Sequence, residues 1–380
     1  MPGSPGRWGV LGALALVVSV AIGATPAHGG TCGDFRIVGS PNVGERSQLS
    51  AVAAIGSSDA WAVGWSVSGG AMEELIEHWD GAIWTVSPNP NPDPAQALLL
   101  GVAGATATDV WAVGSTGDTP QSLIEHWNGT AWAVVTTPSI PGALNSSLSS
   151  ISALSATDAW ADGSYLDSSG DQRSLAFHWN GASWRFARTP KVSGSGHGDV
   201  LGAVAGVATD DVWAAGWFGT DRGTRPLTLH WDGARWNVVA ASGVPGAFFH
   251  FVTGAWAAAS NDVWAVGDSF ATDYRTLTMH WDGSRWGIVP SPGLPNSVLS
   301  AVSGAGGDDV WAVGQVFGTS SPLGLHWAGQ SWTVVPTPKF GNKESWLSGV
   351  AALPGGQVLA VGAYRGTADI TRTLIEERCS

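Results

Sequence analysis

Two short strings recur along this chain with a period of about 50 residues. The first reads DAWAVG at 59–64 and returns five more times, followed by a weaker copy, QVLAVG, at 357–362. The intervals between Trp61 and its equivalents are 50, 49, 53, 51, 47 and 48 residues. The second string, LIEHWDGAIW at 75–84, follows in step and recurs in six units. A period of this length is typical of β-propellers, in which each repeat is a small sheet that packs against its neighbours.

Each unit divides into four strand-like pieces, named A to D from the inside outward. A small-residue stretch such as LSAVAA suits a crowded inner strand A, and VWAVG forms strand B. After a variable loop, L-x-x-H-W forms strand C and W-x-V-V-P forms strand D. Asp-Gly or Asn-Gly between C and D predicts a hairpin turn with positive φ, and the proline ends the pairing of strand D.

The two ends of the chain predict how the ring closes. After QVLAVG the chain supplies TLIEERCS as a C strand and stops before any D strand. DFRIVGSP from Asp34 matches the D strand WTVVPTP at 332–338, with Phe35 in the tryptophan position. We therefore predict an all-β fold, a seven-bladed β-propeller of four-stranded antiparallel blades over residues 28–380, closed by the N-terminal D strand and the C-terminal C strand.

Residues 1–27 have the pattern of a secretory signal peptide. One Arg precedes an apolar run from Trp8 to Gly23, and small residues lead to Ala27. The run is short for a membrane span, and the residues before Cys32 lack the apolar residue of a lipobox. We expect a secreted, extracellular protein with no membrane span after cleavage.

The only two cysteines of the mature chain lie at its ends. In the alignment above, Cys379 takes the position of Asp80 and Cys32 that of Gly81, which are neighbours in an uncut hairpin. That separation suits a disulfide, and an oxidising compartment would preserve it. We predict a Cys32–Cys379 disulfide.

The charge balance limits the partners. Only 12% of the residues are charged, and the formal net charge is -13. Nucleic acid or an anionic membrane would require a basic face, so neither is expected as a partner. We expect a monomer that binds an extracellular protein or a carbohydrate.

The chain resembles the kelch and Asp-box classes of β-propeller repeat, of the secreted bacterial type. The glycine-ended VWAVG strand is similar to kelch repeats, and D-G-x-x-W at the C to D turn is similar to an Asp-box. The resemblance implies the propeller fold and leaves the ligand open.

The repeated side chains are interpreted as residues of the fold. Eighteen tryptophans at repeat positions pack blade on blade, and a ladder for stacking sugars is the alternative. Histidines on strand C of adjacent blades should stand ~13 Å apart, whereas zinc needs ligands at ~2 Å, so no shared metal site is expected. We expect structural hydrogen bonds from His78, His126, His178, His230, His280 and His326. The repeated Asp59, Asp109, Asp158, Asp211, Asp262 and Asp309 are interpreted as turn residues.

Sialidases and galactose-oxidase-like copper enzymes are the two enzyme classes that a propeller of this kind suggests. FRIV at 35–38 resembles the FRIP element of sialidases, but here it falls on an outer strand, and no Tyr/Glu pair is recognisable beside an arginine triad. A galactose-oxidase-like copper site would need a Cys joined to a Tyr, and both cysteines are assigned to closure. We expect no cofactor and no catalytic residue. The alternative is a glycoside hydrolase or lyase of the sialidase type, which should gather Arg, Tyr and acid groups at the channel mouth.

A ligand is expected on the face that carries the B to C and D to A loops, because these loops vary among the repeats. A non-catalytic binding scaffold using this face is the predicted function. The aromatic and Arg residues on it are Trp65, Tyr165, Trp217, Phe218, Arg222, Arg225, Tyr274, Arg275, Phe317, Trp346, Tyr364 and Arg365. Two residues break the repeat further in and are candidates at the channel: Trp256, in a small-residue position, and Asp162, in a valine position.

Overall fold

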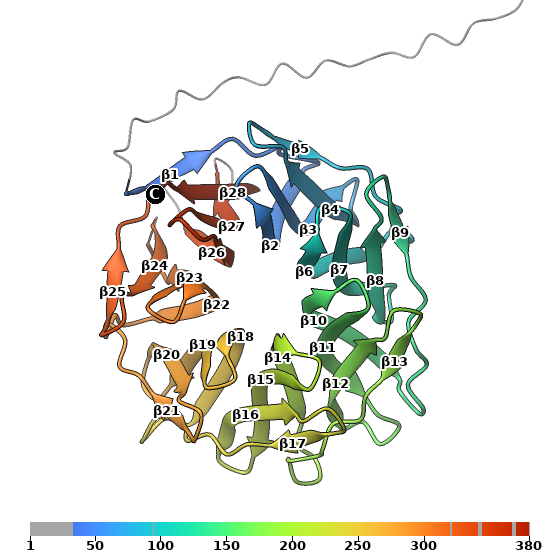
Figure 1. The fold of residues 1–380 in the computed structure, drawn as a ribbon, viewed down its shortest axis with the longest axis vertical. Coiled ribbons are helices and arrows are strands. Elements are labelled where there is room, and N and C mark those ends of the chain that lie inside the picture. Colours follow the sequence, from blue (N-terminus) through green and yellow to red (C-terminus); the bar gives the residue numbers. More distant parts are fainter. Residues whose placement is uncertain (1–32, 94, 320, 341–343, 367–369, 380) are drawn as a thin grey trace, which may run out of the picture.

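The computed structural model describes residues 33–379 except 94, 320, 341–343 and 367–369. Seven four-stranded antiparallel sheets are arranged in a ring around a central channel (Figure 1). In each sheet the strands follow one another outward in the order A, B, C, D. The predicted seven-bladed propeller is confirmed.

The strands have the following bounds. Blade 1 contains β2 (Arg46–Gly56), β3 (Asp59–Ser68), β4 (Ala71–Trp79) and β5 (Trp84–Val86); blade 2 contains β6 (Ala97–Thr106), β7 (Asp109–Thr116), β8 (Gln121–Trp127) and β9 (Trp132–Val134). Blade 3 contains β10 (Asn145–Ser155), β11 (Asp158–Leu166), β12 (Gln172–Trp179) and β13 (Trp184–Phe186); blade 4 contains β14 (Asp199–Ala208), β15 (Asp211–Thr220), β16 (Gly223–Trp231) and β17 (Trp236–Val238). Blade 5 contains β18 (Phe249–Ala259), β19 (Asp262–Phe270), β20 (Tyr274–Trp281) and β21 (Trp286–Ile288); blade 6 contains β22 (Ser297–Gly306), β23 (Asp309–Val316), β24 (Pro322–Trp327) and β25 (Trp332–Val335). Blade 7 contains β26 (Ser345–Ala352), β27 (Val358–Arg365), β28 (Thr371–Arg378) and β1 (Phe35–Val38).

Blade 7 is built from both ends of the chain. Strand β1 pairs with β28 in a register that sets Phe35 opposite Arg378 and Val38 opposite Ile375. The predicted closure of the ring by these two strands is therefore confirmed. Cys32 lies outside the described residues, so its pairing with Cys379 stays a prediction.

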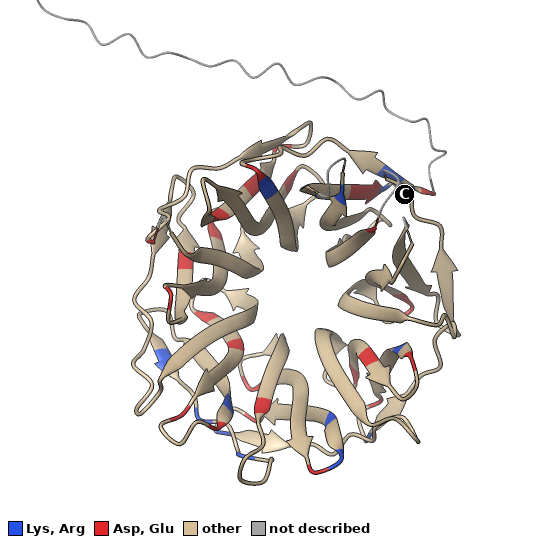
Figure 2. Cartoon of the chain, turned by 180° about the vertical axis from the view of Figure 1, so that it is seen from behind, with Lys and Arg blue, Asp and Glu red and all other residues tan. Residues whose placement is uncertain are grey.

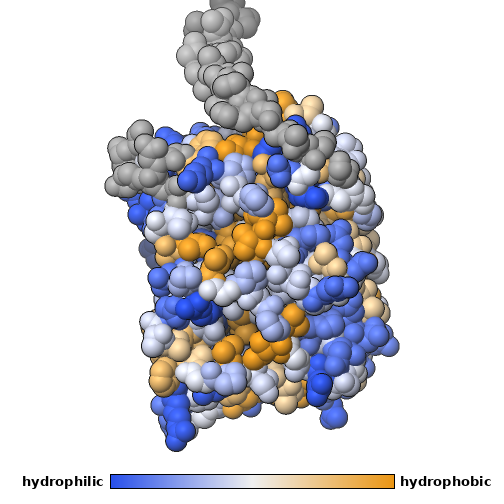
Figure 3. Space-filling model, turned by 90° about the vertical axis from the view of Figure 1, so that its left-hand side faces the viewer, coloured by the Kyte–Doolittle hydropathy of each residue, from blue (hydrophilic) through white to orange (hydrophobic). Residues whose placement is uncertain are grey.

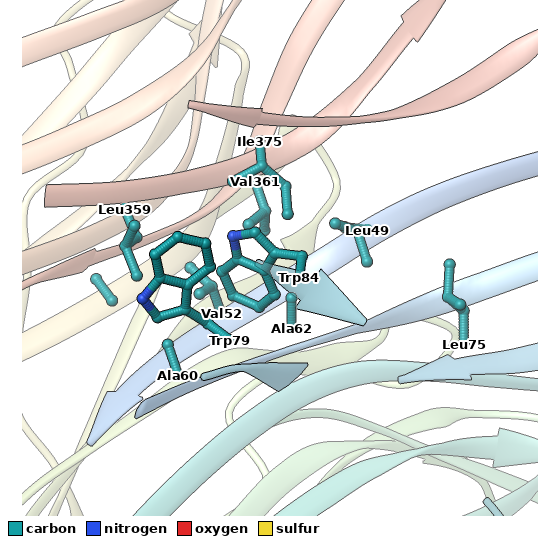
Figure 4. Close-up of a cluster of buried hydrophobic side chains, with 11 residues drawn as sticks. Leu49, Val52, Ala60, Ala62, Leu75, Trp79, Trp84, Leu359, Val361 and Ile375 are labelled. Carbon is teal, nitrogen blue, oxygen red and sulfur yellow. The ribbon is translucent and has the colours of Figure 1, made fainter. Parts of the chain in front are cut away.

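Hydrophobic clusters fill the spaces between blades, as between blades 7 and 1 (Figure 4). There Trp79 and Trp84 from the outer strands of blade 1 lie against Leu359, Val361 and Ile375 of blade 7. The key tryptophan of strand B is at most 3% exposed in each of the six blades that carry it. The repeated tryptophans thus bury large apolar areas between sheets, which is the main term that stabilises such a ring.

The turns on one face of the ring touch each other. Gly81, between strands C and D, has φ +94°, and a Cβ there would lie 2.8 Å from the Cβ of Ser58 in the A to B turn. The Asp80 Oδ1 accepts hydrogen bonds from the N–H groups of Ala82 and Ile83, and these bonds lower the pKa of Asp80. Because consecutive strands are antiparallel, the longer B to C and D to A connections lie on the opposite face, here called the loop face.

Charged residues lie mainly away from the channel, and acidic ones outnumber basic ones around the ring (Figure 2). Within the described part of the chain, no helix has the length and apolar character needed to cross a bilayer.

Candidate functional site

The repeated His and Asp motifs meet in each of the first six blades. In blade 2 the Nε2 of His126 lies 2.6 Å from the Oδ1 of Asp109, and the imidazole stacks on Trp111 with ring centroids 4.1 Å apart. The other five pairs have Nε2 to Oδ1 distances of 2.8 or 2.9 Å. The expected structural hydrogen bonds of these histidines are present, and their partners are the aspartates that the sequence analysis had placed only in turns.

Blade 7 replaces this unit with another polar pair. Gln357 stands in the Asp position and donates from Nε2 to the Oε1 of Glu377, which stands in the His position, over 3.0 Å. Arg378 takes the place of the strand C tryptophan, and its guanidinium lies 4.9 Å from the ring centroid of Trp311 in blade 6. The exchange keeps a cross-strand hydrogen bond and a flat group against the neighbouring blade, so blade 7 is a variant of the same packing unit.

The central channel narrows to a cavity of about 140 Å³ lined by the inner strands. The lining consists of Ser, Thr, Gly, Ala, Val, Ile and Leu residues, and its hydroxyl residues are Ser50, Ser149, Ser150, Thr253, Ser300 and Ser348. These lining residues include no Arg, Tyr or acidic residue.

The two channel candidates are packed between blades. Trp256 lies partly buried against the cluster between blades 5 and 6, over Gly304, where an added Cβ would come within 2.6 Å of its ring. Asp162 is 1% exposed, and neither carboxylate oxygen has a hydrogen-bond partner among the described residues. Burial raises the pKa of Asp162 well above its ordinary value. Neither residue lines the channel cavity.

Several predicted loop-face residues form one continuous aromatic surface across blades 4, 5 and 6. Ring centroids follow one another from Trp217 to Phe251 at 5.3 Å, to Phe249 at 6.4 Å and to Phe270 at 6.3 Å. From Phe270 the path continues to Tyr274 at 5.0 Å and to Phe317 at 5.6 Å. These six residues are called the aromatic surface below.

Three members of this surface are open to solvent. Phe249 is 40% exposed, Tyr274 38% and Phe317 43%, and the adjacent Phe248 is 57% exposed. On the side of the ring seen in Figure 3, apolar side chains also gather in patches among polar ones. On monomeric proteins a contiguous exposed apolar patch often marks a binding site. The sequence analysis found Trp217, Tyr274 and Phe317 but missed the phenylalanines; the run FFHF at 248–251 was the available signal.

Polar contacts hold the loops around the aromatic surface. His250 is fully buried; its Nε2 accepts from the Val244 N–H and its Nδ1 donates to the Thr224 carbonyl, while burial lowers its pKa. Arg225 donates from Nη1 to the carbonyl oxygens of Thr224 and Phe248. Two predicted binding residues next to this surface, Arg225 and Arg275, are thus engaged in holding loops.

The other predicted loop-face residues are spread around the ring. Trp65 and Trp346 are partly buried at the ends of strands, and Phe218 packs against the cluster between blades 3 and 4. Arg365 lies 3.7 Å from Glu344, and the ring of Tyr364 packs edge-on against Phe340. Arg222 is exposed at the tip of the β15 to β16 hairpin. Tyr165 lines a separate pocket in blade 3.

Sequence reasoning also missed a group of buried carboxyls on strand C. Glu77, Glu125 and Glu376 are 0% exposed and occupy the position held by Phe177, Leu229, Met279 and Leu325 in the other blades. Burial raises the pKa of Glu77 and of Glu376 to about 8, and the Ser40 hydroxyl donates to Glu77. The apolar residues at the same position of the other repeats were the signal that could have revealed them.

One of these carboxyls is paired with a second one. Glu74 of β4 and Glu125 of β8 approach each other between blades 1 and 2. Burial raises the pKa of both, and that of Glu125 is raised further because the Glu74 charge is close by. Within the described part of the chain, no three or more His, Cys, Asp or Glu side chains lie close enough together to hold a metal ion.

Comparison with solved structures finds the same fold in proteins of low sequence identity. The structure described as "YCF48 bound to D1 peptide" is 14% identical, has a TM-score of 0.55, and is matched over 91% of this chain and 97% of that one. YCF48 from Cyanidioschyzon merolae gives the same identity and TM-score over 91% and 99% of the two chains. A protein of unknown function from Dyadobacter fermentans is 10% identical, with a TM-score of 0.53 over 91% and 98%.

No family model and no curated protein matches the sequence. The likeness to the solved structures concerns the fold alone. The chain is a seven-bladed β-propeller repeat protein.

Proposed function

We propose that this protein is a binding scaffold that holds an extended, apolar segment of another protein on its loop face, at the aromatic surface. The observation that carries the proposal is the path of six rings over three blades, of which three rings are exposed to solvent. Aromatic side chains dominate the energetics of binding surfaces because they bury large areas with few rotatable bonds.

The spacing of the rings supports an extended peptide as the ligand. An extended chain rises about 3.3 Å per residue, so side chains on one of its faces recur every ~6.6 Å. Successive rings of the aromatic surface are 5.0 to 6.4 Å apart. Alternate side chains of such a segment would therefore each contact a different ring. A carbohydrate is the other ligand class expected from the sequence, and it is an outcome of the test below.

The test uses linear peptides selected from a library of random sequences by binding to the immobilised protein. We expect selected peptides rich in apolar residues, and we expect Tyr274→Ala and Phe317→Ala each to weaken their binding by about thirtyfold. That factor corresponds to about 2 kcal/mol, the usual loss when an anchoring aromatic is truncated. Dissociation constants from fluorescence polarisation measure the effect.

Two controls keep the result specific. Leu144→Ala removes another exposed apolar side chain, and Ser57→Ala changes the opposite face. Both should bind the peptides as the wild-type protein does. Equal losses in all four variants, or binding to a glycan array with no selected peptide, would contradict the proposed ligand class. Arg225 is unsuitable as a probe because it supports the loop carbonyls.

We also propose that the chain is exported and that a Cys32–Cys379 disulfide holds the ends of blade 7. The register of β1 with β28 supports the disulfide. Continuing that register brings the residue after Arg378 alongside the residues that precede Phe35. We propose as well that the repeats are of a kelch-like or Asp-box-like subtype. Mass mapping of non-reduced peptides from the culture medium should find the linked pair. Two alkylated thiols in protein from the medium would rule out the disulfide.

A further inference from the structure

Blade 3 carries a small pocket on its loop-face side that contains two arginines. The cavity has a volume of about 140 Å³, and its walls include Tyr165 at the end of β11, Arg173 at the start of β12, and Arg188 just after β13. Since a water molecule occupies about 30 Å³ of liquid, the cavity has room for a group of roughly four or five heavy atoms. Its wall is more polar than apolar, unlike the aromatic surface.

The same pocket exists in blade 5 with a different lining. All seven residues that line the blade 3 pocket have a counterpart at the equivalent repeat position in a blade 5 cavity of about 260 Å³. Arg275 stands for Arg173, but Ser269 replaces Tyr165 and Pro290 replaces Arg188. The second guanidinium and the phenol therefore distinguish the blade 3 pocket from that of blade 5 and are not required by the repeat.

A hydroxyl pair forms part of the wall in both blades. In blade 3 the hydroxyls of Ser174 and Thr189 are 2.7 Å apart, and in blade 5 those of Thr276 and Ser291 are also 2.7 Å apart. Because this pair is common to the two pockets, it belongs to the architecture of the strand C to strand D edge. The difference in chemistry between the pockets comes from the arginines.

Arg275, the arginine of the blade 5 pocket, has both an ion-pair partner and a hydrogen-bond partner. Its Nη2 lies 2.8 Å from the Oδ2 of Asp273, and its Nη1 donates to the Gly293 carbonyl over 2.7 Å. In blade 3 the Oδ2 of Asp167 is 3.5 Å from the Nη1 of Arg173, and its other oxygen accepts from the N–H groups of Ser169 and Asp171. The carboxylate of Asp171 is also near Arg173, but it pairs with Lys191 over 2.8 Å. Charge-assisted pairs normally close to 2.7–2.9 Å, so Arg173 retains donor capacity.

Arg188 adds a second positive charge to the pocket and has no acidic partner among the described residues. It is exposed, and no hydrogen bond or ion pair of its guanidinium is found within the described residues. The lining of the pocket thus includes two arginines and no acidic residue, in a chain with a formal net charge of -13. Planar guanidinium forks match the geometry of carboxylate, sulfate and phosphate oxygens.

We propose that the blade 3 pocket is a binding site for an oxyanion group, a carboxylate, sulfate or phosphate, held between Arg173 and Arg188 beside the phenol of Tyr165. The site is separate from the aromatic surface and does not depend on the peptide ligand proposed above. It would anchor the anionic group of a ligand on the loop face.

The test is a titration of the full chain with sodium acetate, sulfate and phosphate at constant ionic strength, followed by calorimetry. We expect at least one anion to bind with saturation, and Arg173→Gln and Arg188→Gln each to weaken that binding at least tenfold. The identity of the anion that binds most tightly distinguishes a carboxylate ligand from a sulfate or phosphate ester. Melting temperatures of the variants show whether they remain folded.

Two further variants separate the pocket from general electrostatics. Arg275→Gln removes the equivalent guanidinium of blade 5 and should leave binding within twofold of the wild-type protein. Arg188→Lys keeps the charge but not the planar fork, so it should bind more weakly than the wild type and more tightly than Arg188→Gln. The absence of saturable binding by all three anions, or an equal loss in Arg275→Gln, would overturn the proposal.

Discussion

The protein is expected to lose stability as the pH rises from about 4.5 to about 8. The unfolded carboxyls of Glu77 and Glu376 have an ordinary pKa of 4.5, whereas burial raises their folded pKa to about 8. Because the folded pKa is the higher one, the native state holds protons that the unfolded chain releases above pH 4.5. The stability that these two protonated carboxyls add is therefore fully present below pH 4.5. It declines as the pH rises, and the loss is complete above the folded pKa.

The effect should be large for two groups that are both fully buried. One pKa unit corresponds to about 1.4 kcal/mol, so each carboxyl should lower the free energy of unfolding by on the order of 3 kcal/mol between pH 4.5 and 7. Urea unfolding followed by tryptophan fluorescence at a series of pH values measures it. Glu376→Gln should flatten the pH profile and raise stability at pH 8.

The paired carboxyls between blades 1 and 2 should respond in the same direction. Burial and the Glu74 charge both favour a protonated Glu125, so Glu125→Gln should stabilise the fold above neutral pH. Glu73→Gln on the same strand as Glu74, but partly exposed, is the matched control and should change little. A stability that rises steadily from pH 5 to 8 would contradict the buried placement of these groups.

Replacing Asp162 by valine is expected to stabilise the protein by about 2–4 kcal/mol at neutral pH. The carboxyl lies in an apolar space between blades 3 and 4, near Ala176, Leu201 and Val204, without a hydrogen-bond partner among the described residues. A buried polar group without a partner costs about 1–3 kcal/mol, and a valine adds favourable apolar burial. Valine occupies the same position in blades 1, 2, 5, 6 and 7.

The reciprocal change provides the matched control. Val113→Asp puts a carboxyl into the equivalent position of blade 2 and should destabilise the fold by a similar amount. Both variants are compared with the wild type by urea unfolding at pH 7. If Asp162→Val proves less stable than the wild type, the carboxyl has a partner that supports the fold, and the apolar description of its surroundings is wrong.

Most of the fold could be predicted because its information is repeated within the chain. The Trp61 and His78 strings recur at a constant period, the Asp-Gly turns recur with them, and the missing D strand of blade 7 matches the segment that begins at Phe35. Each repeat is one sheet, and a closed ring leaves little freedom in how the sheets follow one another.

The candidate sites were harder to predict from the sequence, because the repeat does not specify which of its variable residues meet. Trp217, Tyr274 and Phe317 could be named as residues that the repeat leaves free. Their ring contacts cross between blades, because Trp217 meets Phe251 of blade 5 and Tyr274 meets Phe317 of blade 6. Likewise, Arg173 lies on β12 and Arg188 just after β13, and only the pairing of these strands brings both side chains to one pocket.

The sequence by itself determined the strand order, the blade number and the closure of the ring. Tertiary structure alone decided that His126 meets Asp109, that Glu74 meets Glu125 between two blades, and that six rings form one surface. The physical reason is that period and turn chemistry act locally along the chain. Contacts between side chains instead depend on the register within a sheet and on the packing of one sheet against the next, which no single repeat specifies.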